Sequence, residues 1–313
     1  MKKKIKKNTN QENNFSKDSN TQIIRSLNKS KRRAIFTNAT ITISITLLII
    51  PIFTIFTLIY YGYGFDESRG NEFLKVVEST ISITEPNLIV DGDHINHDID
   101  LFSMTGDFQL YKKVGLENKF VRTESYKLWF SQLDQPKKIL GQNNYFIHPS
   151  QPLNIPNKDS VNQILQKLPE GTVSEMFISF DSLYHEKDIK NIFNDFDVEL
   201  IWYAVSIEDH VGEYNQVIGY PAQTRNINSS FNEEKSNQEQ LSNVLQFLSK
   251  HENWVEAITK NLNIKEVKEY IDHNGIQIYG ATVTGPTKEF LNIGELKEIR
   301  EYHLGDVELW NWK

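Results

Sequence analysis

Cysteine is absent from the 313 residues of this chain. Its absence excludes disulfide bonds, thiol nucleophiles and every zinc site that uses cysteine. A disulfide-free protein with an outer domain is more typical of a bacterial surface than of a eukaryotic secretory pathway.

Sequence motifs for common catalytic chemistry are also missing. There is no Walker phosphate loop, no Gly-x-Ser-x-Gly elbow, no His-Glu-x-x-His pair and no dinucleotide-binding glycine pattern. We therefore predict that the protein is not an enzyme and that it has no cofactor.

One polar segment, "DGDHINHD", gathers several side chains that bind metals in other proteins. Aspartates in a polar turn mostly accept hydrogen bonds from their own backbone. We predict a turn here and no metal site. The residues concerned are Asp91, Asp93, His94, His97 and Asp98.

Charge is absent from Ala34 to Phe65, a run of 32 residues. Within it, a helix over Ile41–Tyr60 would be about 30 Å long, which matches the hydrocarbon core of a bilayer. A cleaved signal peptide is disfavoured because the apolar stretch is too long and no small-residue cleavage site follows it. We predict one transmembrane helix with its flanks over residues 34–65. The residues expected to anchor it are Ile41, Leu47, Pro51, Phe53, Phe56 and Tyr60.

The two sides of this apolar stretch differ in charge. Residues 1–33 hold 11 Lys and Arg but only 2 Asp and Glu, whereas the whole chain carries −7. Positive residues at the end of a membrane helix favour the cytoplasmic side. Lys31, Arg32 and Arg33 therefore predict a cytoplasmic N-terminus and an extracytoplasmic C-terminal bulk, in a single-pass protein of the cell membrane.

Residues 1–33 form a basic arm with one small apolar feature. Asn20 or Thr21 can cap a short helix that carries Ile23, Ile24 and Leu27 on one face. One interpretation is a helix lying on anionic lipid headgroups, held there by lysines. The other is a docking motif for a cytoplasmic partner. Direct nucleic-acid binding is not expected, because no fold or aromatic pattern supports it.

The outer part reads as two segments. Residues 66–155 contain a predicted helix, "NEFLKVVEST", followed by extended chain from Ile81 and two strands, "GDFQLYKKVG" and "KFVRTESYKLWF". A proline-rich linker precedes a C-terminal domain over residues 160–313, in which strands and helices alternate. One long helix is predicted from Ser236, which opens a capping box with Glu239. The expected fold is an α+β domain, a β-sheet covered by helices.

Four motifs of the C-terminal domain stand in an order and spacing that resembles a known family: "SEMFISFD", "LIWYAVS", "IGYP" and "GATVTGPTKEF". They resemble the C-terminal domain of the Gram-positive sigma factor regulator family. The segment from Lys29 to about Val114 resembles the N-terminal module of that family. The resemblance covers about nine tenths of the chain. It implies a membrane-bound anti-sigma factor for an extracytoplasmic-function sigma factor.

Two functions follow from these observations. The first is a regulator that senses the cell envelope outside and holds a sigma factor inside, directly or beside a second membrane protein. The second is a membrane-tethered extracellular binding or hydrolytic domain whose arm only sets the topology. The resemblance favours the first. Since Ile23, Ile24 and Leu27 form the one small apolar face of an otherwise polar arm, we expect them to contact the partner.

Overall fold

The computed structural model describes residues 2–62, 68–92, 95–134, 140, 145–153, 158–207, 217–223, 236–260 and 262–312, with side chains from residue 21 onward. The chain divides into two compact units, residues 1–57 and 58–313. We describe each by itself.

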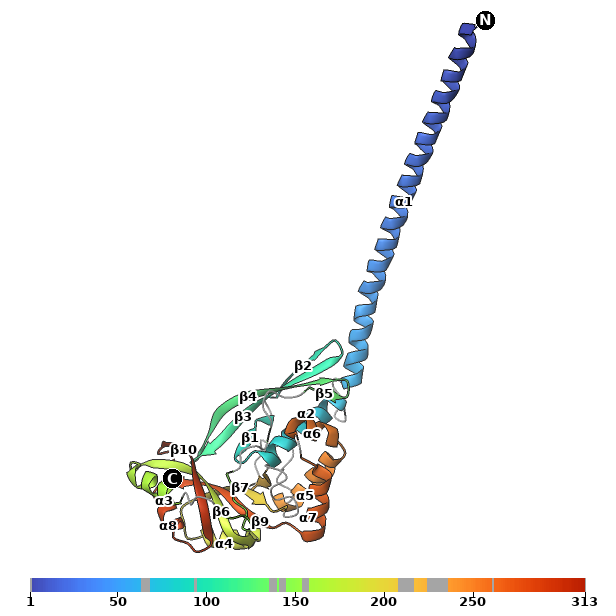
Figure 1. Cartoon of the computed structure of the whole chain (residues 1–313). Coiled ribbons are helices and arrows are strands. Elements are labelled where there is room, and N and C mark those ends of the chain that lie inside the picture. The colour runs from blue at the N-terminus through green and yellow to red at the C-terminus, as the bar shows by residue number, and fades with distance from the viewer. Residues whose placement is uncertain are drawn as a thin grey trace. The chain divides into compact units, whose positions relative to one another are not determined.

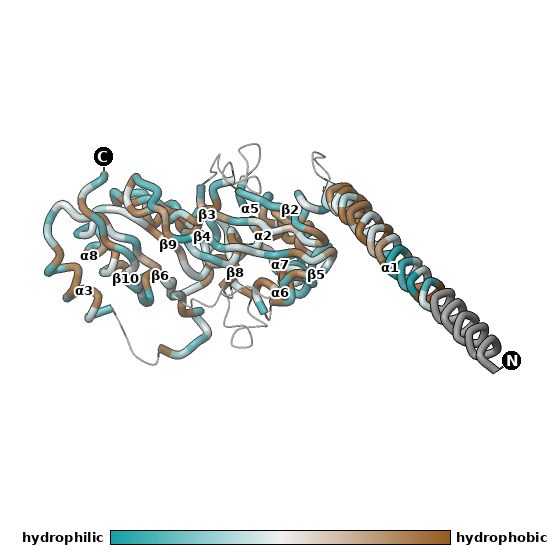
Figure 2. Tube along the Cα trace, turned by 90° about the horizontal axis from the view of Figure 1, so that it is seen from above, coloured by the Kyte–Doolittle hydropathy of each residue, from teal (hydrophilic) through white to brown (hydrophobic). Residues whose placement is uncertain are grey.

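The first unit is one helix, α1 (Lys2–Tyr61), whose last turn belongs to the second unit. The sequence predicts a short arm helix and a separate span. The structure joins them, since no Gly or Pro interrupts the chain between Asn20 and Ile50. The stretch Thr21–Tyr61 is long and apolar enough to cross a membrane, and almost none of it is buried. The colouring of α1 changes from hydrophilic teal to hydrophobic brown along this stretch (Figure 2).

Threonine hydroxyls inside α1 are satisfied within the helix. Thr42 Oγ1 donates to the carbonyl of Asn38 at 2.9 Å, and Thr54 Oγ1 donates to that of Ile50 at 3.0 Å. Such bonds to the preceding turn remove the cost of placing a hydroxyl in lipid. They also keep a Thr-rich stretch helical, although its "TITISIT" pattern alternates like a strand.

The second unit has the α+β class predicted from the sequence and contains two antiparallel sheets (Figure 1). Sheet A has the order β1-β3-β4-β5, and β2 also pairs with β3. The pair β3–β4 is a long hairpin whose register runs from Ser103↔Trp129 to Val114↔Glu117. The strands are β1 (Leu88–Val90), β2 (Asn96–Asp100), β3 (Ser103–Val114), β4 (Glu117–Trp129) and β5 (Gln132–Leu133).

Sheet B has the strand order β10-β6-β9-β7-β8. Its central strands are almost completely buried, which explains why they read as near-continuous apolar runs in the sequence. The strands are β6 (Thr172–Tyr184), β7 (Glu199–Val205), β8 (Ile218–Pro221), β9 (Ile278–Pro286) and β10 (Ile299–Leu309).

The second unit also contains helices. Figure 1 shows α5, α6 and α7 gathered beside α2. Helix α2 contacts α5 and α6, and α7 contacts both of these. The helices are α2 (Arg69–Thr84), α3 (Lys158–Lys167), α4 (Glu186–Phe193), α5 (Asn237–Ser249), α6 (Glu252–Thr259), α7 (Ile264–Asn274) and α8 (Glu289–Ile293).

Helix α2 is longer than the sequence predicts, because residues 81–84 continue it instead of forming extended chain. Ile81 and Ile83 are fully buried. The hydroxyls of Ser82 and Thr84 donate to carbonyls one turn back, at 3.0 and 2.6 Å. Burial and these bonds together overcome the weak helix propensity of β-branched residues.

The long helix predicted from Ser236 begins with the expected capping box but is broken in two. The break lies between Ser249 and Glu252, and α7, which the sequence analysis did not identify, follows. After the break Trp254 lies edge-on to Phe73 of α2, with ring centroids 6.3 Å apart. Its indole N–H donates to the carbonyl of Ser131 at 2.8 Å. Contacts with distant parts of the chain therefore accompany the break.

The two predicted outer segments share one hydrophobic core. A single cluster of buried side chains includes Phe73 and Phe108 from residues 66–155 together with Tyr203 and Val255 from residues 160–313. The indole N–H of Trp202 also donates to a carbonyl of α2, that of Ser82, at 3.0 Å. The division into two segments at about residue 155 stays a prediction. In the structure, buried side chains from both segments pack in the same core.

Candidate functional site

The predicted partner-binding residues lie exposed on α1. Ile23, Ile24 and Leu27 are 55, 58 and 62% exposed. Because successive helical residues turn by about 100°, these three share one stripe of the helix surface. Three neighbouring exposed apolar side chains can bind in the groove of a partner protein or lie on a lipid surface.

The opposite side of the same helical segment is basic. Arg25, Lys29 and Arg32 recur at spacings of four and three residues and form a second stripe. Lys31 and Arg33 are exposed as well. The segment thus offers an apolar face and a cationic face within three turns, directly before the uncharged stretch.

The predicted membrane anchors project outward from α1. The exposed fractions of Ile41, Leu47, Phe53 and Phe56 lie between 44 and 66%. Pro51 stands within the helix and does not end it. A helix that exposes this many large apolar side chains requires an apolar environment, such as the hydrocarbon core of a bilayer.

The last turn of α1 is bound to sheet A through two tyrosines. The Tyr61 hydroxyl lies 2.9 Å from the carbonyl of Leu128 and 3.2 Å from that of Phe102. It also accepts the N–H of Phe130 at 2.8 Å. The hydroxyl of Tyr60 contacts that of Ser131 at 3.0 Å. The chain therefore leaves the apolar stretch at a fixed point on the second unit.

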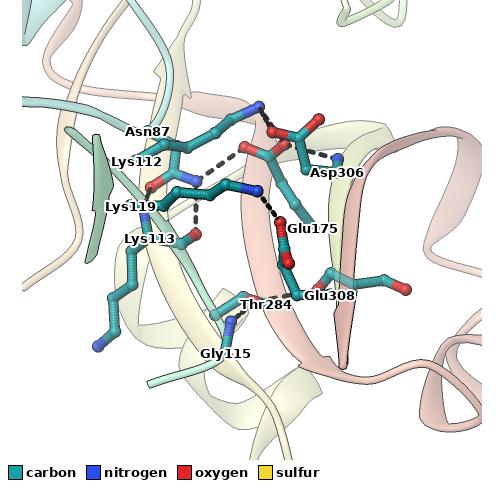
Figure 3. A network of polar contacts seen from close by, with 10 residues as sticks. Asn87, Lys112, Lys113, Gly115, Lys119, Glu175, Thr284, Asp306 and Glu308 are labelled. Atoms are coloured by element: carbon teal, nitrogen blue, oxygen red, sulfur yellow. Dashed lines mark hydrogen bonds and ion pairs between the residues drawn. The ribbon is translucent and has the colours of Figure 1, made fainter. Parts of the chain in front are cut away.

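A polar junction joins the other end of the β3–β4 hairpin to sheet B (Figure 3). At its centre is Glu175 of β6, whose side chain has no exposed surface. Its carboxylate accepts from Lys112 Nζ at 2.6 Å, from Asn87 Nδ2 at 2.7 Å and from the N–H of Asp306 at 3.2 Å. Donors from β3, β10 and the turn before β1 therefore converge on one buried carboxylate.

The charges at this junction perturb one another. Burial raises the pKa of the Glu175 carboxyl, and Lys112, Asn87 and the N–H of Asp306 oppose this shift. The pKa of Lys112 is raised because the attraction of Glu175 and Asp306 outweighs the cost of its own burial. A buried charge of this kind is tolerated only while its partner is present.

Further pairs extend the junction along the hairpin. Lys113 pairs with Glu199 of β7, and Lys119 pairs with Glu308 of β10. The N–H of Gly115 donates to Thr284 Oγ1 of β9 at 2.8 Å. Sheet B is thus bound to the hairpin through four of its strands.

The possible metal ligands of "DGDHINHD" are not brought together in the described residues. His97 and Asp98 are exposed on β2, and Asp91 precedes that strand. Asp93 and His94 lie outside the described residues. Over the part of the chain that the structure describes, no group of three or more His, Asp and Glu side chains is arranged to hold a metal ion.

Local sequence patterns do not reveal Glu175, Lys112 and Tyr61 as functional or structural centres. One signal was present for Glu175, since it is the single charge in the apolar strand "TVSEMFISF". A charge within a fully buried strand needs a partner. The partner itself is 63 residues away, and no local pattern identifies it.

Comparison with known proteins supplies the remaining observations. A family model described as "Sigma factor regulator N-terminal" matches residues 25–119, and one described as "Sigma factor regulator C-terminal" matches residues 165–306. The "Probable anti-sigma-M factor YhdL" of Bacillus subtilis (strain 168) is 34% identical over 298 residues, covering 90% of this chain and 82% of the relative. No solved structure gives a significant match.

Proposed function

Because the chain belongs to the sigma factor regulator family, we propose that it is a membrane-bound anti-sigma factor that restrains a sigma factor. The observation that carries this proposal is the 34% identity to a probable anti-sigma-M factor over 90% of the chain. The family is regulatory, and we propose no catalytic activity. The tethered-domain alternative has no comparable support.

The proposed orientation places the basic arm in the cytoplasm and the second unit outside. Lys31, Arg32 and Arg33 support it, because basic residues next to a membrane helix are retained on the inner side. A sigma factor works inside the cell, so a regulator that binds it through the arm requires this orientation. The second unit is then available to an envelope signal.

The proposed partner is an extracytoplasmic-function sigma factor, held directly or beside a second membrane regulator. The contact surface is the apolar stripe of Ile23, Ile24 and Leu27. Its support is the exposure of the three side chains. The N-terminal family match starts at residue 25 and includes Leu27, but not Ile23 and Ile24. Lipid headgroups are the competing occupant, attracted by the basic stripe.

Substitutions in the stripe separate these occupants. Ile23→Asp with Ile24→Asp removes two apolar anchors and leaves every lysine and arginine in place. Loss of an interface anchor costs about 2 kcal/mol, roughly a 30-fold change in affinity. The variant should release the sigma factor, so that a reporter of that factor's promoter rises while the protein stays in the membrane fraction.

The matched control is Gln22→Asp with Ser26→Asp, which adds the same charge on exposed positions outside the stripe. It should repress normally, as should the replacement of Lys2, Lys3 and Lys4 by Gln. Reporters for each extracytoplasmic-function sigma factor of the source genome identify the partner. If gene deletion changes none of them, or if the stripe variant represses like the control, the regulatory proposal is wrong.

The orientation has its own test. Protease added to intact protoplasts should digest the second unit and spare a tag fused to the N-terminus. Digestion of the tag with protection of the second unit would reverse the orientation.

A further inference from the structure

Several exposed apolar side chains of the second unit gather beside the last turn of α1. Leu101, Trp129 and Phe130 are 43, 42 and 48% exposed, and Tyr60 is 37% exposed. Phe102 is half-buried between them. We call Tyr60, Leu101, Phe102, Trp129 and Phe130 the turn patch.

Three rings of the turn patch, those of Tyr60, Phe102 and Phe130, lie close to one another. The ring of Phe130 lies 5.6 Å from that of Tyr60 and 5.7 Å from that of Phe102, measured between centroids. The N–H of Phe130 donates to the carbonyl of Phe102 at 3.3 Å. Two hairpin turns, Leu101–Phe102 between β2 and β3 and Phe130–Ser131 between β4 and β5, therefore lie side by side.

The backbone of both turns is strained at the aromatic residues. Phe102 has φ +70° and Phe130 has φ +49°. Hairpin turns usually place Gly, Asn or Asp at such positions, because a bulky side chain there costs about 1–2 kcal/mol. The same sheet follows the usual rule at its other turn, where Gly115 has φ +66°. Strained residues of this kind concentrate where a side chain has a function.

The position of the turn patch along the chain indicates what covers it. Tyr60 is the last residue of the apolar stretch predicted to span the bilayer, and Phe130 packs on its ring. The two turns therefore lie within a side chain's length of the point where the chain leaves the hydrocarbon core. Aromatic residues are enriched at that level of a membrane, where an apolar ring and a polar edge are both accommodated.

We propose that the turn patch is a lipid-binding surface that docks the second unit on the bilayer. Leu101, Phe102, Trp129 and Phe130 insert into the membrane–water interface on the extracytoplasmic side of the cell membrane. The proposal rests on the proposed membrane insertion of α1 and is independent of the sigma factor.

The charges beside the turn patch show that the attachment is mainly apolar. Lys127 Nζ lies 3.4 Å from Asp100 and 4.7 Å from the centroid of the Trp129 ring. The indole N–H of Trp129 donates to Asp134 at 2.9 Å. A second cation, Arg69, lies 5.8 Å from the centroid of the Tyr60 ring. Because Lys127 and Arg69 are balanced by Asp100 and Asp134, these described residues carry no excess positive charge for anionic headgroups. The docking should therefore resist high salt, which screens headgroup attraction.

The absence of cysteine makes the test direct, since any introduced cysteine is a unique labelling site. Leu101→Cys places a nitroxide spin label on the turn patch. Leu116→Cys is the matched control, a leucine of similar exposure, 46%, in the turn at the other end of β3. Leu47→Cys, inside the apolar stretch, reports whether α1 is inserted.

Each labelled full-length chain is reconstituted in vesicles of phosphatidylethanolamine and phosphatidylglycerol. The measurement compares relaxation of the spin label by oxygen, which partitions into lipid, with relaxation by a water-soluble nickel complex. With Leu47→Cys in lipid, the oxygen-to-nickel ratio at Leu101→Cys should be several-fold higher than at Leu116→Cys and unchanged in high salt.

Three results would overturn the proposal. A ratio at Leu101→Cys equal to that of Leu116→Cys in water means that the turns do not reach lipid. Protection of Leu101→Cys from both reagents means that protein, such as a second copy of the chain, covers the turn patch. Lipid exposure at both positions means that the whole hairpin lies on the bilayer and that the two turns are not a specific surface. A water-like Leu47→Cys label would refute the membrane insertion itself.

Discussion

The two ends of the β3–β4 hairpin differ in composition although they belong to the same two strands. At one end, the neighbouring turns carry two aromatic residues in strained conformations, the half-buried Phe102 and the exposed Phe130. At the other end the turn uses Gly115, and the flanking side chains are lysines paired with carboxylates of sheet B. Gly115 also lies where a Cβ would clash with Asn311 and Val173, so this turn needs glycine for close packing as well as for its positive φ. A turn that keeps a phenylalanine at positive φ retains it for what the ring contacts.

The two ends also differ in how they are fixed. The aromatic end is bound through the neutral hydroxyl of Tyr61, which contacts three backbone groups. The charged end depends on the buried pair of Glu175 and Lys112. With 12 residues in β3, the ends are separated by about 40 Å. The hairpin thus connects the last turn of α1 to sheet B, and each end can be tested separately.

The largest effect is expected from Lys112→Met at the charged end. It leaves Glu175 buried without its cation, and breaking a buried pair in this way typically costs about 3–5 kcal/mol. We expect about 3 kcal/mol, the lower limit, because Glu175 can take up a proton and Asn87 still donates to it. Urea unfolding of the full chain in detergent, followed by tryptophan fluorescence, measures this loss.

The matched control for that variant is Lys119→Met on the neighbouring strand. Lys119 is exposed, so its pair with Glu308 is screened by solvent and should contribute little to stability. Equal losses for the two variants would contradict the view that the buried pair, and not the number of pairs, fixes the charged end.

The pH dependence of stability gives the second, smaller effect. Burial raises the pKa of Glu175 above its ordinary value of 4.5. The folded state therefore binds more protons at this site than the unfolded state between pH 4.5 and the folded pKa, and stability falls as the pH rises through that window. The Glu175→Gln variant lacks this titratable carboxyl group.

The measurement is the free energy of unfolding of the wild type minus that of Glu175→Gln, compared from pH 4 upward. Other titrating groups cancel in this difference to a first approximation. The difference should decrease as the pH rises. An increase would show that Lys112 and the two other donors outweigh burial and hold the pKa of Glu175 below 4.5.

What the sequence predicts correctly is local. The uncharged run gives the apolar helix, the Ser236–Glu239 capping box gives the start of α5, and the segment "NEFLKVVEST" gives most of α2. Each of these depends on residues within a few positions of one another, where periodicity and capping chemistry operate.

What the sequence does not predict depends on distant residues. The donors to Glu175 include residues 88 and 131 positions away. The break between α5 and α6 accompanies contacts of Trp254 with Phe73 and Ser131. The turn patch has the same origin, since Phe102 and Phe130 are unremarkable in the sequence and become neighbours only when β3 and β4 pair.

At the aromatic end, Tyr61→Phe should cost about 1–3 kcal/mol, because it removes a buried hydroxyl that both donates and accepts. Tyr60→Phe is the matched control on the adjacent residue. Its hydroxyl contacts an exposed serine, and water replaces that partner. The same urea experiment compares them. An equally large loss for Tyr60→Phe would contradict the view that the buried Tyr61 hydroxyl is what fixes this end of the hairpin.

The smallest effect on stability is expected from Phe130→Asn, and it sharpens the comparison between the two ends. Asparagine tolerates positive φ, so the substitution relieves strain while it removes an exposed ring. The free energy of unfolding in detergent should change by less than about 1 kcal/mol, in either direction. In vesicles, the same variant should lower the oxygen-to-nickel ratio of a label at Leu101→Cys, because one of the anchoring rings is gone. A large loss of stability in detergent would show that Phe130 is retained for packing, and the aromatic end would then resemble the charged end in serving the fold alone.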